Sequence, residues 1–283
     1  MNWYINQLVH LILQNYLSIM RRHRINSICS IEPALGHSLE QVANNSFNSK
    51  ELKWIEQIED YRRLALNTTT SIEVEYLGAG HFPFRSRYRK KYTYNTHQRT
   101  IAKIARYSST QKFGGSFLFS LIRHYQPTVG IELGTSIGIS ASYHGAALAL
   151  NGFGKLITIE GANNIAEYAR NQLSRLGLSS VMVVTGRFED VLKDILKKYG
   201  PIDYLFIDGD HHFQATINYF NICLPSFRPH GIVVVDDIYW SKGMRNAWRT
   251  LCNYPQVKIG ITLFTMGILV LQDLQGLRKL YRL

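Results

Sequence analysis

The sequence predicts an α/β fold in which a mostly parallel β-sheet is covered by helices on both faces. From Thr128 onward, short apolar segments alternate regularly with amphipathic helical segments. The apolar segments are apolar along their whole length, which is typical of parallel strands buried on both sides. The first of them is followed by a glycine-containing turn and a helix, the order that opens a nucleotide-binding α/β unit.

Five segments have the composition of parallel strands, and helical segments separate them. The strands are predicted at Val129–Glu132, Leu156–Glu160, Ser180–Val184, Tyr204–Asp208 and Ile232–Asp236. The helices are predicted at Ile139–Leu150, Asn164–Leu176, Glu189–Tyr199, Phe213–Leu224 and Ser241–Asn253. Two final strands, Val257–Leu263 and Ile268–Gln272, are joined by a turn too short for a crossover helix. We therefore expect these two strands to pair antiparallel.

The N-terminal region, residues 1–110, is predicted to be a mostly helical appendage to an α/β domain formed by residues 111–283. Asn48 and Glu51 have the spacing of a capping box and predict a helix over Leu52–Leu66. Further helices are predicted at Thr100–Tyr107 and Phe113–Tyr125. In Met1–Met20, apolar residues recur at helical spacing at Ile5, Leu8, Ile12, Tyr16 and Ile19. We expect this stripe to pack on the protein, with an interfacial helix as the alternative.

The formal net charge of +12 is unevenly distributed along the chain. No Asp or Glu occurs from Tyr76 to Ile131, a stretch that includes the basic, tyrosine-rich loop Arg85–Tyr94. Met1–Ile31 also lacks acidic residues and contains Arg21, Arg22 and Arg24. The positive electrostatic potential of these basic stretches favours an anionic partner, namely a nucleic acid, a phosphorylated substrate or anionic lipid. A solvated basic face is the alternative interpretation.

The cysteines and the hydropathy limit the class of protein. Cys29, Cys223 and Cys252 are widely spaced and form no C-x-x-C motif, which predicts a reducing, cytoplasmic location and no structural zinc. No segment has the roughly 20 consecutive apolar residues that span a bilayer. The charges of the N-terminal segment follow its apolar part, unlike those of a cleavable signal peptide.

The turn after the first strand has the pattern E-x-G-x-x-x-G, formed by Glu132, Gly134 and Gly138. Glycine lets the backbone approach a ligand closely, and the following helix offers unpaired N–H groups. The pattern is not G-x-G-x-x-G, so it argues against a dinucleotide pyrophosphate and for a ligand with an amine or a carboxylate at the turn. A tight turn without a ligand is the alternative.

Acidic residues stand at the ends of four of the predicted parallel strands: Glu132, Glu160, Asp208 and the pair Asp236-Asp237. The carboxyl ends of the strands form the ligand crevice of an open α/β sheet, so we expect these side chains to converge. Holding several carboxylates together costs repulsion and desolvation. We therefore expect a cationic group among them.

The residue types indicate individual roles. Glu160, which precedes Gly161, can accept hydrogen bonds from both hydroxyls of a ribose, with a helix cap as the alternative. Asp208, Asp236 and Asp237 are hard oxygen ligands that suit Mg²⁺. His211 is a candidate general base, and His212 is a weaker candidate. A loop histidine bonded to backbone is the alternative for each.

These motifs are similar, in order and spacing, to those of class I S-adenosylmethionine-dependent methyltransferases, and the nearest group resembles the catechol O-methyltransferase-like enzymes. The matching residues are Glu132-Leu133-Gly134-Thr135-Ser136-Ile137-Gly138, Glu160-Gly161, Phe206-Ile207-Asp208-Gly209-Asp210-His211 and Val235-Asp236-Asp237-Ile238. The resemblance covers about Phe113 to Val270.

The resemblance implies a Rossmann-like, seven-stranded sheet whose last two strands form an antiparallel hairpin. It implies that Glu132 and the loop Gly134–Gly138, with Thr135 and Ser136, hold the methionine portion of S-adenosylmethionine. Glu160 and Gly161 would lie at the ribose, and Gly186–Asp190, which includes Glu189, at the adenine.

Asp208, Asp236 and Asp237 fall where metal-dependent members bind a divalent cation. The family often has Asp then Asn at the last pair, so Asp236-Asp237 departs from its pattern. Metal-dependent members also commonly place a lysine base three residues after the first metal-binding aspartate, where this sequence has His211.

The sequence thus favours a methyltransferase that modifies an oxygen of a small molecule, anionic or neutral, with or without Mg²⁺. The resemblance implies that residues 111–283 bind S-adenosylmethionine and that residues 1–110 cap the site and select the substrate. Asp208 and His211 are the predicted catalytic residues. One alternative is an RNA methyltransferase, suggested by Tyr88, Tyr92 and Tyr94 among basic residues, although no N-P-P-Y-type motif or Pro-Cys nucleophile occurs. Another is a protein that binds the cofactor without catalysis or docks on membranes through Met1–Arg24.

Overall fold

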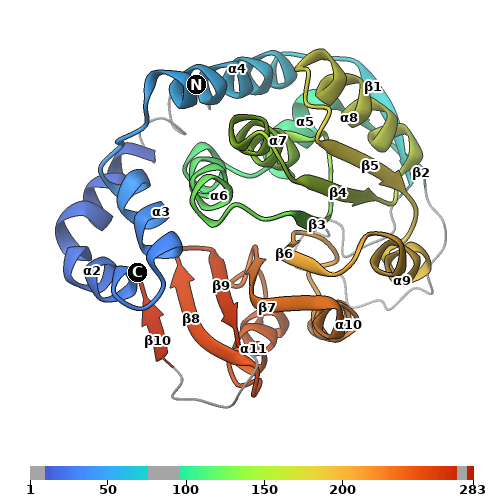
Figure 1. Cartoon of the computed structure of the whole chain (residues 1–283). Coiled ribbons are helices and arrows are strands. Elements are labelled where there is room, and N and C mark those ends of the chain that lie inside the picture. Colours follow the sequence, from blue (N-terminus) through green and yellow to red (C-terminus); the bar gives the residue numbers. More distant parts are fainter. Residues whose placement is uncertain (1–9, 76–95, 273–278) are drawn as a thin grey trace.

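The computed structural model describes residues 10–75, 96–272 and 279–283, and its main feature is a mostly parallel β-sheet between two layers of helices (Figure 1). Within these residues the sheet has eight strands in the order β10-β8-β9-β7-β6-β3-β4-β5. The strands are β3 (Val129–Leu133), β4 (Lys155–Glu160), β5 (Val181–Thr185), β6 (Ile202–Ile207), β7 (Phe227–Val235), β8 (Val257–Leu263), β9 (Met266–Leu271) and β10 (Lys279–Arg282).

The strand pairing confirms the predicted fold class and corrects the number of strands. β3, β4, β5, β6 and β7 are mutually parallel, whereas β9 pairs antiparallel with both β7 and β8, as expected from the short turn between β8 and β9. The expected number of seven strands is wrong, because β10 adds an eighth strand that pairs parallel with β8 through Lys279–Arg282. This four-residue segment has no long apolar run, so its sequence gives little sign of a strand. Its place depends on backbone pairing with β8 and on a contact with the N-terminal region.

Helices cover both faces of the sheet. One face carries α6 (Lys112–Tyr125), α7 (Ile139–Asn151) and α8 (Asn163–Arg175), and the other carries α9 (Phe188–Tyr199), α10 (Phe213–Cys223) and α11 (Lys242–Leu251) (Figure 1). A short 3₁₀ turn, η2 (Leu224–Ser226), follows α10. Alternate residues of β6 serve the two layers, since Tyr204 and Phe206 join one core and Leu205 and Ile207 the other. This two-sided burial explains why the strands are apolar throughout.

The N-terminal region is helical with one unpredicted hairpin. Its elements are a helical segment at residues 10–15, the π-helix η1 (Tyr16–Met20), α2 (Arg22–Cys29), α3 (Pro33–Ala43), α4 (Ser49–Leu66), β1 (Ser71–Glu75), β2 (Thr96–Thr100) and α5 (Ile101–Tyr107). β1 and β2 form a separate antiparallel pair. The basic loop Arg85–Tyr94, with Tyr88, Tyr92 and Tyr94, lies outside the described residues. The division of the chain near residue 110 stays a prediction.

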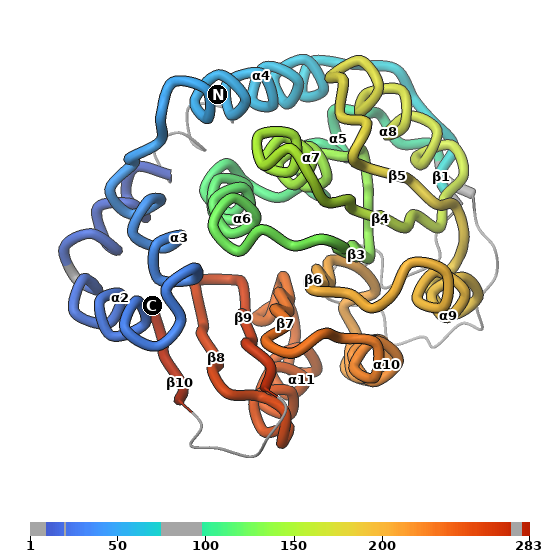
Figure 2. Tube along the Cα trace, viewed as in Figure 1, coloured from blue at the N-terminus to red at the C-terminus, as the bar shows by residue number. Residues whose placement is uncertain are grey.

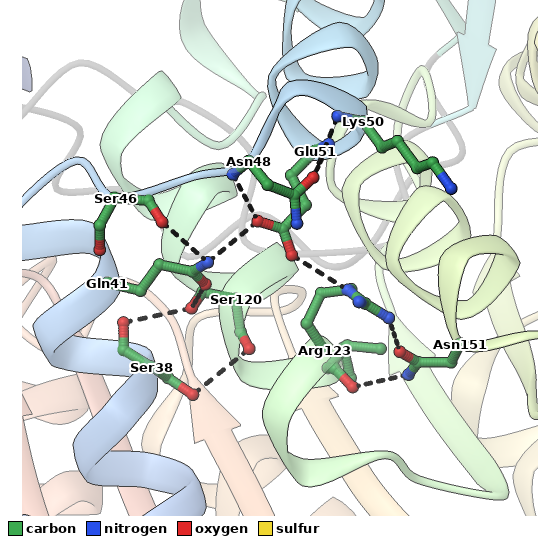
Figure 3. Close-up of polar contacts among 10 residues, drawn as sticks. Ser38, Gln41, Ser46, Asn48, Lys50, Glu51, Ser120, Arg123 and Asn151 are labelled. Atoms are coloured by element: carbon green, nitrogen blue, oxygen red, sulfur yellow. Dashed lines mark hydrogen bonds and ion pairs between the residues drawn. The ribbon is translucent and has the colours of Figure 1, made fainter.

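A polar network joins α4 to the helices beneath it (Figure 3). The predicted capping box is confirmed: the Asn48 side chain accepts from the backbone of Glu51 at 3.1 Å, and the Glu51 carboxylate accepts from the backbone of Asn48 at 3.0 Å. The same carboxylate accepts from Gln41 of α3 at 3.0 Å and from Arg123 of α6 at 3.2 Å. Arg123 in turn donates to Asn151 at the end of α7. Glu51 thus stabilises the start of α4 and connects it directly to α3 and α6, and through Arg123 to α7.

The N-terminal helical segment is oriented differently from the prediction. Ile12 and Ile19, which were expected to pack inward, are 56% and 74% exposed, whereas Gln14 and Leu17 are buried. The reason is a polar anchor, since the Gln14 amide donates to the Val42 carbonyl of α3 at 3.0 Å. An amide buried without this bond would be costly, so it selects the face that packs. Ile5 and Leu8, from the same predicted stripe, lie outside the described residues.

Candidate active site

A cavity of about 570 Å³ opens at the carboxyl ends of β3, β4, β6 and β7. These strands flank the point between β3 and β6 at which the order of the sheet reverses, where ligands bind in open α/β sheets. The cavity brings together nine of the residues predicted as functional: Gly134, Ser136, Glu160, Gly161, Glu189, Asp208, His211, Asp236 and Asp237. Three further predicted residues, Glu132, Thr135 and Gly138, are not among the residues that line it.

The loop after β3 depends on its glycines. Gly134 has φ +105°, and a Cβ atom there would lie 2.2 Å from the carbonyl oxygen of Asp208. Any side chain would therefore collide with the backbone at the end of β6, which lies beside β3 in the sheet. Gly138, with φ +86°, is the N-cap of α7, and its N–H donates to the Thr135 carbonyl at 2.9 Å. The Thr135 hydroxyl lies 2.6 Å from that of Thr158 on β4. The loop is therefore held closely against both neighbouring strands.

Glu160 ties the ends of β3 and β4 together at the cavity wall. One carboxylate oxygen accepts from the backbone N–H of Ser136 at 2.9 Å, and the other accepts from that of Ala162 at 3.0 Å. Burial raises the pKa of Glu160, and the bonds from Ala162 and Ser136 oppose that effect. The N-cap of α8 is Ala162, so the alternative role of Glu160 as an N-cap is wrong. The carboxylate is fixed in orientation and still has acceptor capacity toward the cavity.

Glu132 is fully buried at the end of β3, on the face of the sheet covered by α7. Neither carboxylate oxygen has a hydrogen-bond partner within the part of the chain that the structure describes. Burial raises the pKa of Glu132 to about 7. Any direct contact between Glu132 and a ligand remains a prediction.

Three aspartates, Asp208, Asp236 and Asp237, line the cavity close to one another. Burial, and then repulsion from Asp236 and Asp237, raises the pKa of Asp208 well above its usual value. Burial and repulsion from Asp237 raise the pKa of Asp236 to about 7. No set of three His, Cys, Asp or Glu side chains within the described ranges is arranged as a finished metal site. The carboxylates do fit a cation, because a positive group among them would relieve the repulsion.

His211, rather than His212, faces the cavity. Its Nε2 atom lies 3.8 Å from a carboxylate oxygen of Asp237, and its ring centroid is 6.0 Å from that of Trp240, another residue of the wall. His212 is exposed and contacts Asp210 at 2.9 Å at the start of α10. The structure therefore favours His211 as the histidine that can reach a bound molecule.

Backbone strain is concentrated around this cavity. Seven non-glycine residues within the described ranges have a positive φ, and four of them line the cavity: Ser136, Asp210, Asp237 and Phe264. Each such conformation costs on the order of 1–3 kcal/mol and persists where the surroundings enforce it. Strain of this kind typically occurs where a fold must aim polar groups at a ligand.

The other half of the cavity was not predicted from the sequence. Its wall comes from the N-terminal region and from the β8–β9 turn, and its apolar members are Leu13, Val74, Ile104, Tyr107, Phe113, Leu263 and Phe264. Arg99 and Arg187 add positive charge to the lining. These residues resemble ordinary core positions in the sequence, because no motif marks an apolar side chain as part of a wall. The predicted helical N-terminal region was the only feature of the sequence that pointed to this apolar wall.

The strand order, the glycine loop and the acidic strand ends together form the Rossmann-like fold that the resemblance found in the sequence implies. Residues 131–238 match a protein-family model described as a methyltransferase domain. A sequence search of curated proteins gave no match.

Solved structures share this fold. The SAH-bound methyltransferase PaMTH1 of Podospora anserina is 15% identical, with a TM-score of 0.53 over 80% of this chain and 97% of that chain. The O-methyltransferase TomG of Streptomyces achromogenes, which is involved in tomaymycin synthesis and was solved with SAM, is 24% identical, with a TM-score of 0.50 over 59% of this chain and 82% of that chain. At these identities the similarity concerns the fold.

Proposed function

We propose that this chain transfers a methyl group from S-adenosylmethionine to an oxygen of a small molecule. The observation that carries the proposal is that two kinds of residue line one cavity. The glycine loop and Glu160 line it together with apolar residues of the N-terminal region, and His211 and the aspartates also belong to the lining. We infer that the first group holds the donor and that the apolar residues hold the acceptor. A donor and an acceptor bound in this way could meet inside one enclosure.

The residues of the cavity fit S-adenosylmethionine. The backbone of Gly134 and Ser136 would approach the methionine portion, Glu160 would accept from the ribose hydroxyls, and Glu189 lies on the wall expected at the adenine. The acidic lining suits a cofactor that carries an ammonium and a sulfonium group. When bound, this cofactor supplies an already activated methyl group, so the protein has to position the acceptor and remove its proton.

We assign proton removal to His211. A neutral imidazole can take the hydroxyl proton as the acceptor oxygen attacks, and Asp237, 3.8 Å away, can stabilise the protonated ring. Arg99 and Arg187 in the same lining favour an acceptor with an anionic group. The apolar wall would exclude water from the acceptor.

A divalent cation is a further part of the proposal. Asp208, Asp236 and Asp237 would hold Mg²⁺, and such an ion lowers the pKa of a bound hydroxyl. Isothermal titration with Mg²⁺ should show binding that Asp236→Asn weakens. Full activity in EDTA would contradict the catalytic role of a metal.

The central test is cofactor binding, measured by isothermal titration. Glu160→Gln should weaken S-adenosylmethionine binding roughly tenfold or more, because hydrogen bonds to a charged group contribute about 1.5–3 kcal/mol. Glu167→Gln, an exposed change on α8, should leave it unaltered. A screen of hydroxylated acceptors, with and without Mg²⁺, would then identify the substrate. Absence of cofactor binding by the unaltered protein would overturn the proposal.

The remaining proposals concern location. Cys29, Cys223 and Cys252 are free thiols, which supports a reducing, cytoplasmic compartment. Among the helices that the structure describes, none combines the length and the hydropathy of a membrane-spanning segment.

A further inference from the structure

The N-terminal helical segment has two faces with different partners. On the inner face, His10 and Leu13 line the cavity, and Gln14 is anchored to α3. On the outer face, Leu11, Ile12 and Ile19 are 56%, 56% and 74% exposed. Three large apolar side chains at helical spacing on one exposed face indicate a surface that something else covers.

Exposed basic residues follow this apolar face directly along the chain. Arg22, His23 and Arg24 of α2 are exposed, and residues 1–31 contain no Asp or Glu. The partner of this face should therefore be negatively charged as well as apolar. An anionic lipid surface has both properties, since it takes up apolar side chains at the acyl boundary and attracts bases at the headgroups.

The last strand extends the same basic surface. Arg24 donates to the carbonyl of Arg282, and the hydroxyls of Ser27 and Tyr281 lie 3.2 Å apart, so α2 runs beside β10. Lys279 and Arg282 of β10 are exposed. Figure 2 shows α2 and β10 on one side of the molecule, away from α9 and α10. The nearest acidic residue in sequence, Glu32, is paired with Lys258 at 3.7 Å.

We propose that this face, formed by Leu11, Ile12 and Ile19 with Arg22 and Arg24, docks the protein on anionic lipid bilayers. The helical segment would lie along the surface with its apolar side chains at the acyl boundary and the two arginines at the headgroups. Because the inner side of the same segment lines the cavity, docking would bring the apolar half of the cavity close to the lipid. This proposal is independent of the chemistry assigned to the cavity.

The test is flotation of the full chain with two kinds of vesicle, phosphatidylcholine alone and phosphatidylcholine mixed with phosphatidylserine. The unaltered protein should float with the anionic vesicles only, and less of it should float as salt increases. Ile12→Ser with Ile19→Ser should reduce binding at least about tenfold, because each exposed side chain loses apolar transfer energy. Arg22→Gln with Arg24→Gln should reduce vesicle binding about fivefold for each charge removed.

Matched variants test whether the location of the changes matters. Leu64 on α4 is 71% exposed, and Lys193 and Lys197 on α9 are exposed bases. Leu64→Ser, and Lys193→Gln with Lys197→Gln, should leave flotation unaltered. All variants change exposed side chains, and Arg24→Gln also removes one hydrogen bond to the Arg282 carbonyl. A melting temperature within a few degrees of that of the unaltered protein shows that a variant is folded.

Three outcomes would overturn the proposal. The first is no flotation of the unaltered protein with anionic vesicles. The second is equal loss of flotation in the matched variants. The third is a dimer, seen by light scattering, that Ile12→Ser with Ile19→Ser converts to a monomer, because the face would then cover a second copy of the chain.

Discussion

A carboxylate oxygen of Glu132 lies 3.7 Å from Nδ1 of His144, and neither side chain is exposed to solvent. Burial raises the pKa of Glu132 to about 7 and lowers the pKa of His144 to about 3. His144 is therefore neutral near pH 7, and the contact is not an ion pair. Nε2 of His144 lies 2.9 Å from the hydroxyl of Tyr204, so a buried polar chain runs from β3 through α7 to β6.

Glu132 should make stability fall as pH rises. An acid with a pKa of 4.5 in the unfolded chain and about 7 in the folded protein contributes most stability below pH 4.5, and this contribution is lost as pH rises through 7. Glu132→Gln should therefore raise the free energy of unfolding at pH 8 by up to about 3 kcal/mol, with little change near pH 4.5. Urea unfolding at both pH values measures this.

The same variant separates stability from function. If Glu132 holds the methionine portion of the cofactor, Glu132→Gln should bind S-adenosylmethionine more weakly while being more stable at pH 8. Glu167→Gln, an exposed control, should change neither property. A Glu132→Gln protein that is less stable at pH 8 would contradict the assigned pKa.

Gly134→Ala should abolish cofactor binding. The added Cβ would lie 2.2 Å from the backbone carbonyl of Asp208, so the loop or β6 must move. Gly152→Ala is the matched control, because Gly152 also has a positive φ but nothing lies within 4 Å of its added Cβ. The control should lose about 1–2 kcal/mol of stability and keep its cofactor affinity. Isothermal titration of both variants checks this, and normal binding by Gly134→Ala would refute the role of the loop.

His211→Gln should lower kcat by about 10²–10⁴-fold if His211 is the general base. The dissociation constant for S-adenosylmethionine should stay within about twofold, because the histidine is assigned to the acceptor. His212→Gln, whose residue is exposed and bonded to Asp210, is the control and should retain activity. Steady-state kinetics on the identified acceptor measures this difference. Equal losses of kcat in both variants would contradict the role of His211 as the general base.

Arg62→Met should destabilise the fold by about 3–5 kcal/mol, because it leaves a buried carboxylate without its partner. The Arg62 side chain is 1% exposed and lies 2.8 Å from Glu59, which also accepts from the Tyr143 hydroxyl of α7 at 2.7 Å. Arg63→Met is the control, since Arg63 is 49% exposed and pairs with Asp60 at the surface. It should cost about 0–1 kcal/mol. Thermal unfolding of both variants would show whether the buried pair stabilises the packing of α4 on α7.

Much of the ligand-binding half follows from local pattern. Residues such as Glu160 and Asp208 end apolar strands, and parallel strands share one direction, so the order of strands and helices already predicts that these carboxylates meet at one edge. The glycines of the loop after β3 are equally visible, because a left-handed backbone demands them. In the structure Glu160, Asp208 and Asp236 line one cavity, whereas Glu132 is not among its lining residues.

The remaining features depended on contacts between distant parts of the chain. The hydrogen bond from the Gln14 amide to the Val42 carbonyl orients the N-terminal helix so that Ile12 and Ile19 face outward. β10 forms because the backbone of four residues without a strand-like pattern pairs with the edge strand β8.

The sequence by itself therefore determined the five parallel strands, the hairpin that follows them, the helices between them and the acidic residues at the strand ends, since periodicity and strand direction are local properties. Only the tertiary structure decided which apolar residues form the second wall of the cavity. An apolar side chain such as Leu13 or Phe264 has the same local pattern whether it fills a core or lines a cavity, and the difference lies in what packs opposite it.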